Sequence, residues 1–317
     1  MATTLHHSKK YAVQQTWKEN QKMPSAKLAK RLSFLTMSAM SIGLTIGVGF
    51  SLAAPVLPTL QQAMRLLYGP AYTKPGSVVS TSDPQGVRYN KPTDYRHTIV
   101  EFVTPWASQT VSLGNKSYFI ATGQGYALAD PSNPSAAAHY QSAYISAIWF
   151  VLEGDRWVVA GKQQNLTADG TFGRVGGKPG APFYRTIPLG QSVLLVAGEQ
   201  SVMYQGTSSK WYPVYRFDTR GIRALGALPS GGDNTNAMQP PVISFTGKII
   251  GAKETPGHAP VFTISYTGTT VLNGHPAELA NVKCSFVYRQ QIASQSIPQR
   301  SPSTTPECEA IVASGRF

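Results

Sequence analysis

WFVLEGDRWVV, residues 149–159, consists of two apolar runs on either side of a Gly-Asp pair. Runs of β-branched and aromatic residues around a two-residue turn predict a β-hairpin. Because both faces of these strands are apolar, we expect the hairpin to lie centrally in a sheet that is covered on both sides. The composition is typical of a turn-rich β protein, since only 14% of the residues are charged and the chain contains 29 Gly and 23 Pro.

Further strands are predicted on both sides of this hairpin. Runs rich in Val, Ile, Tyr, Phe or Trp lie at 97–104, 116–122, 142–152, 156–161, 192–197, 202–205, 211–217, 242–250, 261–266 and 282–289. Because glycines interrupt the series at 169–182, we expect one β-rich domain at 96–170 and a second domain, or a continuation, at 183–317. Short helical segments are expected at 134–140 and 276–283, and an irregular segment at 229–241. The predicted fold is therefore mainly β, sandwich- or barrel-like, with few short helices.

Residues 33–64 contain no charged side chain. A helix of about 20 apolar residues crosses the hydrocarbon core of a bilayer, so we expect a transmembrane helix at 33–58. The preceding tail, residues 1–32, holds seven Lys/Arg and one acid. The positive-inside rule places this tail in the cytoplasm and the rest of the chain in the periplasm or outside the cell. The charge of the tail also favours contact with anionic membrane lipid.

Two other interpretations of this uncharged stretch stay open. The tripeptide Ser51-Leu52-Ala53, followed by Ala54, is similar to a signal-peptide cleavage site, and cleavage there would release the β-rich part. A buried helix of a soluble domain is the second interpretation, although the stretch does not alternate apolar with charged positions.

Small residues lie four positions apart within the expected membrane helix, at Ala39, Gly43, Gly47 and Ser51. This spacing places them on one helix face, which would let a second helix approach closely. We therefore predict a helix–helix contact there. The general abundance of small residues in membrane helices is the alternative explanation.

Residues 59–95 are expected to form a short helix and a linker. Pro58-Thr59 is typical of a helix start and Gly69-Pro70 of a helix end, so the helix should cover 60–68. Residues 73–94 contain Pro, Gly, Ser and Thr without a useful period, and we expect them to be irregular.

The chain contains two cysteines, Cys284 and Cys308. In an oxidising compartment a disulfide between them would close a loop of about 25 residues and contribute about 3 kcal/mol of stability. Two free thiols are the alternative. No metal site is expected, because no His or Cys pair at ligand spacing lies nearby.

Catalytic signatures are absent from the sequence. None of the six His lies in a zinc-helix or Cys/His nucleophile motif, and phosphate-binding and serine-nucleophile motifs are missing as well. Three weak candidates, each with a simple structural explanation, are Asp94 with His97, Glu153 with Asp155, and Asp233 with Asn234 and Asn236. We therefore expect neither enzymatic activity nor a cofactor. Nucleic acid is not an expected partner, because no Lys/Arg run is interleaved with aromatic residues.

Aromatic residues and arginine meet in the run KWYPVYR, residues 210–216. Mixtures of aromatic residues and Arg are typical of interface hot spots, and a proline suits an edge strand. We therefore predict a partner-binding edge formed by Trp211, Tyr212, Tyr215 and Arg216. A strand whose aromatic residues complete the core is the alternative.

In its layout of basic tail, single span and exported domain, the chain resembles bitopic inner-membrane assembly subunits of type IV secretion and conjugation machines. The resemblance concerns topology alone and assigns no functional residues. It implies a non-enzymatic structural role in an envelope-spanning complex, with membrane or envelope proteins as partners and an oligomeric state. A membrane-anchored envelope enzyme acting on cell wall or glycans, and a secreted adhesin-like protein, are the alternative functions.

Overall fold

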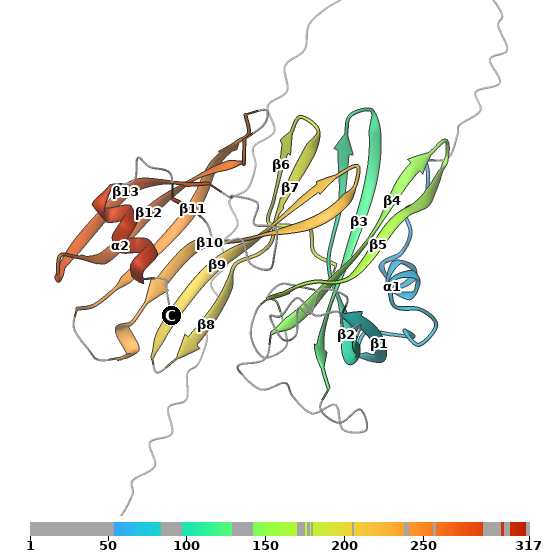
Figure 1. Cartoon of the computed structure of the whole chain (residues 1–317), viewed down its shortest axis with the longest axis horizontal. Helices are drawn as coiled ribbons and strands as arrows, with labels where there is room; N and C mark the ends of the chain where they lie inside the picture. Colours follow the sequence, from blue (N-terminus) through green and yellow to red (C-terminus); the bar gives the residue numbers. More distant parts are fainter. Residues whose placement is uncertain are drawn as a thin grey trace, which may run out of the picture. The chain divides into compact units, whose positions relative to one another are not determined.

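The computed structural model describes residues 54–83, 97–128, 142–169, 175, 178, 180–204, 206–237, 241–255, 258–287, 299–300 and 305–314. These residues belong to one compact unit. They form mainly β structure, as predicted, in one sheet of five strands and one of nine. Figure 1 shows a short helix beside each sheet, α1 next to the first and α2 next to β12 and β13 of the second.

The first sheet is an antiparallel meander whose strands follow one another in sequence order. Its strands are β1 (Ser77–Asp83), β2 (His97–Leu113), β3 (Lys116–Ala127), β4 (Ala143–Glu153) and β5 (Arg156–Asp169). The predicted hairpin is confirmed, because Glu153 pairs with Arg156 around a Gly-Asp turn whose Gly154 has a φ of 63°. Of the two strands of this hairpin, however, only β4 lies inside the sheet. The expectation of a central hairpin is wrong for β5, which is the last strand.

Strand β5 is irregular along its length. Phe150 of β4 pairs with Val159 and Trp149 pairs with Gly161, so Ala160 is an extra residue in a β-bulge. A second irregularity includes Asn165, whose φ is 51° and whose backbone N–H donates to Ser146 Oγ at 3.0 Å.

The segment expected to be an irregular linker contains strand β1. Ser77, Val79 and Thr81 are buried and the residues between them are exposed, so the strand has a period of two. Two of the three buried residues carry hydroxyls, so the buried positions of this strand do not form an apolar pattern in the sequence.

The second sheet follows the order β14-β13-β12-β11-β10-β9-β7-β6, and β8 pairs with β9. Its strands are β6 (Arg185–Leu189), β7 (Ser192–Val196), β8 (Gln200–Tyr204), β9 (Thr207–Asp218), β10 (Gly221–Asp233), β11 (Ser244–Lys253), β12 (Val261–Leu272), β13 (His275–Val287) and β14 (Gln299–Arg300). The expected irregular segment at 229–241 is wrong for 229–233, which belong to β10. The expected helical turn at 276–283 is a strand, and helix α2 (Pro306–Ser314) was not predicted.

In the second sheet, β10 and β11 are joined by a short ladder. Only residues 231–233 of β10 pair with 244–246 of β11. Beyond that point two backbone carbonyls of β11 accept side-chain hydrogen bonds: Ile249 O from Arg185 Nη1 at 2.6 Å, and Gly247 O from Tyr212 Oη at 3.3 Å. Because Arg185 belongs to β6, this side chain connects the far end of the sheet to β11.

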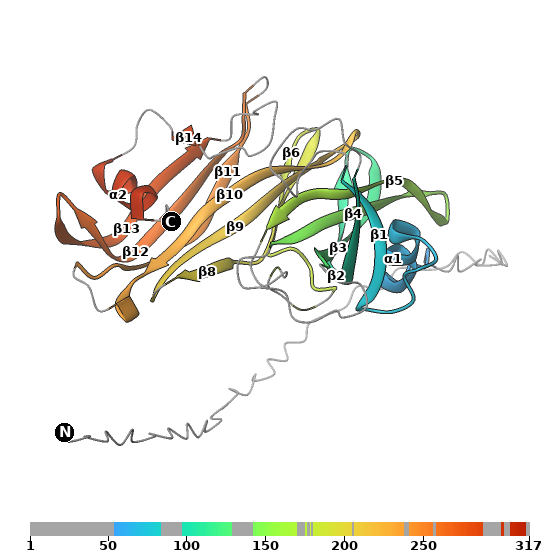
Figure 2. The ribbon, with the colours of Figure 1, turned by 60° about the horizontal axis from the view of Figure 1, so that its bottom comes forward.

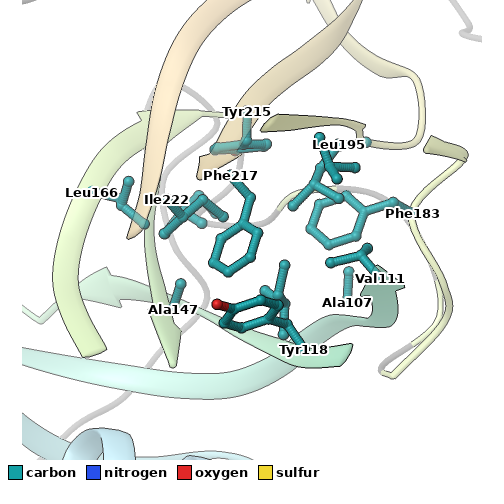
Figure 3. Packing of buried hydrophobic residues seen from close by; sticks show 14 of the residues in the cluster. Ala107, Val111, Tyr118, Ala147, Leu166, Phe183, Leu195, Tyr215, Phe217 and Ile222 are labelled. Atoms are coloured by element: carbon teal, nitrogen blue, oxygen red, sulfur yellow. The ribbon is translucent and has the colours of Figure 1, made fainter. Parts of the chain in front are cut away.

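A shared hydrophobic core joins the two sheets, and Figure 3 shows its side chains converging from both. Tyr118 of β3 meets Phe217 of β9 edge to face, with their ring centroids 5.1 Å apart. The opposite face of the first sheet packs against helix α1 (Leu60–Tyr68), which Figure 2 shows beside β1. The opposite face of the second sheet packs against α2. A single hydrophobic cluster therefore includes residues of both sheets.

The predicted membrane helix lies almost entirely outside the described residues. Its last five residues, 54–58, are described and are not helical. Pro55 and Pro58 explain why these five residues are not helical, because a proline lacks an N–H donor and disfavours helical backbone in the residue before it. No helix in the described ranges is long and apolar enough to cross a membrane. The span at 33–53, the tail at 1–32 and the helix at 134–140 therefore stay predictions.

Candidate functional site

Helix α1 is confirmed at the predicted residues, Leu60–Tyr68. Its start is a capping box, in which Thr59 N donates to Gln62 Oε1 at 2.8 Å and Gln62 N donates to Thr59 Oγ1 at 3.2 Å. Its end is Gly69, whose φ of 87° is readily adopted by glycine. The helix therefore begins and ends for reasons contained in its own sequence.

One face of α1 is buried on the first sheet. Its buried side chains are Ala63, Met64, Leu67 and Tyr68, which recur at the spacing of a single helix face. On the sheet they contact a hydrophobic cluster made of Val79, Val103, Phe119, Ala121, Ile148 and Phe150. We call this contact the helix-docking site.

Side chains of β5 bind the C-terminal end of the helix. Lys162 Nζ donates to the backbone carbonyl of Leu66 at 2.8 Å, and Gln164 Nε2 donates to that of Leu67 at 3.0 Å. Carbonyls in the last turn have no partner within a helix, and a cation there also interacts favourably with the helix dipole. Strand β5 thus supplies hydrogen bonds that α1 cannot make for itself.

A buried polar cluster lies beneath the helix-docking site. It consists of Thr81, Glu101, Ser146 and Asn165, none of which is more than 2% exposed. Thr81 Oγ1 donates to Glu101 Oε1 at 2.6 Å and accepts from Asn165 Nδ2 at 3.2 Å. The cluster therefore connects β1 and β5, the two outer strands of the sheet.

Two glycines of β3 make room for this arrangement. A Cβ atom on Gly125 would lie 2.6 Å from Glu101 Oε2. A Cβ atom on Gly123 would overlap the hydroxyl of Tyr68 and lie 3.0 Å from Met64 Sδ. Glycine is therefore required at both positions for the helix and the carboxylate to occupy their sites.

Burial raises the pKa of Tyr68 well above its ordinary value, and the nearby carboxylate of Glu101 raises it further. The phenol is consequently neutral at physiological pH. Because Tyr68 and the cluster are sealed from solvent, a soluble substrate cannot reach these polar groups. The site is suited to holding α1 against the sheet. Among the described residues, no group of three His, Cys, Asp or Glu could bind a metal.

The sequence contained signals for this site that were missed. Glu101 is the single acid of the 17-residue strand β2. Gly123 and Gly125 interrupt the strand KSYFIATGQGYA, where larger residues would be expected. An isolated acid in one apolar strand and a Gly-x-Gly pair in the next indicate a buried polar group with space cleared beside it.

The edge position predicted for Trp211, Tyr212, Tyr215 and Arg216 is wrong, because β9 is an internal strand paired with β10 on one side and with β7 and β8 on the other. Partner binding by these residues stays a prediction. Tyr212 and Tyr215 are buried, and Arg216 forms an ion pair with Glu254 at 3.0 Å. These side chains complete the core and its margin.

Pro213 is compatible with an internal strand because of its position. The ladder with β7 ends where Val214 pairs with Val196, and the ladder with β8 begins where Trp211 pairs with Gln200. Pro213 lies between them, and its carbonyl accepts from Ala197 N at 2.8 Å. Its missing N–H therefore falls where the neighbouring strand changes from β7 to β8.

The disulfide between Cys284 and Cys308 is present, and it joins β13 to α2. The helix–helix residues Ala39, Gly43, Gly47 and Ser51 lie outside the described residues, as does Asp94.

The weak acidic candidates take structural positions. Glu153 and Asp155 are exposed at the hairpin turn. Asp233 accepts hydrogen bonds from Thr235, and Asn234 donates to Pro241 O at 3.0 Å and accepts from Ile243 N at 2.6 Å. The side chains of Asp233 and Asn234 therefore stabilise the loop after β10.

Comparison with known proteins gives no relative from which a function could be transferred: no family model, no curated protein and no solved structure matches the chain.

Proposed function

We propose that the chain is a non-enzymatic, single-pass protein of the cytoplasmic membrane, with its N-terminus in the cytoplasm. Its β-rich part is a structural subunit of an envelope-spanning complex, such as a type IV secretion or conjugation machine. Its partners are other membrane or envelope proteins, and it works as an oligomer.

The helix-docking site is the observation that carries this proposal. Helix α1 begins at Leu60, within the uncharged stretch at 33–64, and its apolar face is part of the core. Only residues 54–59 separate the predicted span at 33–53 from helix α1. Such a short connection favours a structural link between membrane and domain over a long, loose tether.

The disulfide between Cys284 and Cys308 supports an exported location. Disulfides persist in the periplasm and outside the cell, whereas the cytosol keeps thiols reduced. Since the positive-inside rule places the tail on the opposite side of the membrane, charge and cysteine chemistry favour the same topology.

Alkaline extraction of membranes tests the anchor with the full chain carrying a C-terminal tag. Retention in the membrane pellet is the expected result. A soluble mature form that begins at Ala54 would contradict the anchor and favour a secreted protein instead.

Cross-linking in the native host, followed by purification in detergent, tests the assembly role. We expect defined cross-linked species that Gly43→Leu or Gly47→Leu weakens, because a bulky side chain would separate the packed helices. Thr45→Leu, on the opposite helix face, is the matched control and should leave them unchanged. A membrane-retained chain that is a lone monomer under all conditions would contradict the assembly role.

A further inference from the structure

The outer surface of α1 and the segment that leads into it combine exposed apolar side chains with positive charge. Val56 is 87% exposed, Leu57 44% and Leu66 48%. Arg65 is also exposed, and Lys162 of β5 lies beside the helix with its ammonium group on the carbonyl of Leu66. We call these five residues the helix outer surface.

The helix outer surface carries no negative charge. Between Ala54 and Ser82 the sequence has no Asp or Glu, and its charged residues are Arg65 and Lys74. A surface that joins apolar side chains to Lys and Arg is typical of contact with an anionic bilayer.

The length of the connection limits where this surface can lie. Residues 54–59 precede α1, and at 3.3–3.6 Å per extended residue they reach about 20 Å at most. Because α1 is packed on the first sheet and bound by Lys162 and Gln164, the whole face moves with it. Given the proposed anchor, on which this inference rests, the start of α1 stays within this distance of the bilayer, and the nine residues of the helix, at about 1.5 Å each, add at most about 14 Å.

We propose that the helix outer surface rests on the bilayer, with Val56, Leu57 and Leu66 at the acyl boundary and Arg65 and Lys162 among anionic headgroups. A second copy of the chain is a poorer occupant. A two-fold contact would use the same patch on both copies and place cations of equal sign together. An anionic lipid surface instead provides the opposite charge.

Site-specific fluorescence on the full chain tests this contact. Both natural cysteines form the disulfide, so one introduced cysteine can be labelled selectively. Leu66→Cys would carry an environment-sensitive dye, in vesicles of phosphatidylethanolamine and phosphatidylglycerol that contain a nitroxide-labelled lipid. Met203→Cys is the matched control, because Met203 is an apolar residue of β8 in the second sheet and is 64% exposed.

The inference expects the dye at position 66 to lose most of its fluorescence to the nitroxide, and the dye at 203 to lose little. Vesicles of phosphatidylcholine should weaken the quenching at 66, since the cations would then lack anionic partners. Equal quenching at both positions, or none at either, in chains that alkaline treatment leaves in the vesicles would overturn the lipid contact. Release of the chain by alkaline treatment would instead overturn the anchor itself.

Discussion

The indole N–H of Trp211 donates to Oδ1 of Asp169 at 2.8 Å and so joins β9 of the second sheet to the end of β5 of the first. Net contributions of hydrogen bonds to charged acceptors are about 1.5–3 kcal/mol, and partial exposure should place this one at the lower end. We expect Trp211→Phe and Asp169→Ala each to lower the free energy of unfolding. A double-mutant cycle in urea should give a coupling of about 1.5 kcal/mol. If the two losses in the free energy of unfolding were strictly additive, the hydrogen bond would make no contribution to stability.

Gly123→Ala should destabilise the protein by about 1–3 kcal/mol, because the new methyl would overlap Tyr68 and Met64 in a packed core. Gly251→Ala is the matched control, since a Cβ atom there would meet nothing within 4 Å. Urea unfolding of the two variants measures the difference. Introducing Tyr68→Leu should reduce the cost of Gly123→Ala, and an equal cost in both backgrounds would contradict the assigned overlap.

Reduction of the disulfide should destabilise the protein by about 3 kcal/mol in the chain-entropy picture. Cys284 and Cys308 are 24 positions apart, so opening the bond returns considerable freedom to the unfolded chain. Unfolding curves with and without reductant give this difference. The double variant Cys284→Ala/Cys308→Ala is the control, and its midpoint should not respond to reductant. A response of equal size in that variant would assign the effect to another cause.

The pKa of Asp233 is held below its ordinary value of 3.8, first by the hydrogen bond from the Thr235 hydroxyl and then by that from the Thr235 backbone N–H. A depressed pKa means that the ionised carboxylate stabilises the folded state. This contribution is complete above 3.8 and disappears as the pH falls through the folded-state pKa.

Asp233→Asn should therefore be less stable than the wild type near neutral pH, and the difference should shrink in acid. Urea unfolding of both proteins across this range measures it. Thr235→Val removes the hydroxyl that lowers the pKa of Asp233 most, so the stability of this variant should change less with pH than that of the wild type. A difference that is constant with pH would contradict this assignment.

Local signals in the sequence predicted the elements whose stability is local. The hairpin at Gly154-Asp155 and helix α1 both depend on turn and cap residues within a few positions, and both are confirmed. Strand β1 was missed because Ser77 and Thr81 face the core, where a polar residue is acceptable only if it is hydrogen-bonded. Ser77 is bound by the nearby Thr73 and Lys74, whereas the partners of Thr81 are distant in sequence. Asn165, whose amide donates to Thr81, is 84 positions away.

The same limitation explains the incorrect edge at Trp211–Arg216. Aromatic residues and arginine suit an interface and a core margin equally, and the pairing of β9 with β7, β8 and β10 decides between them. The helix-docking site was missed for a related reason. Tyr68, Glu101 and Gly123 come from three separate elements, and only the folded sheet brings them together.

The bulge at Ala160 affects how readily β5 can pair with a strand of another molecule. Among the described residues β5 is an edge strand that pairs only with β4. The unpaired backbone groups of an edge strand can pair with a strand of another molecule. Ala160 interrupts the ladder there, while Arg156 and Lys162 place charge on either side of it. The interrupted and charged strand therefore resists edge-to-edge pairing with a strand of another copy.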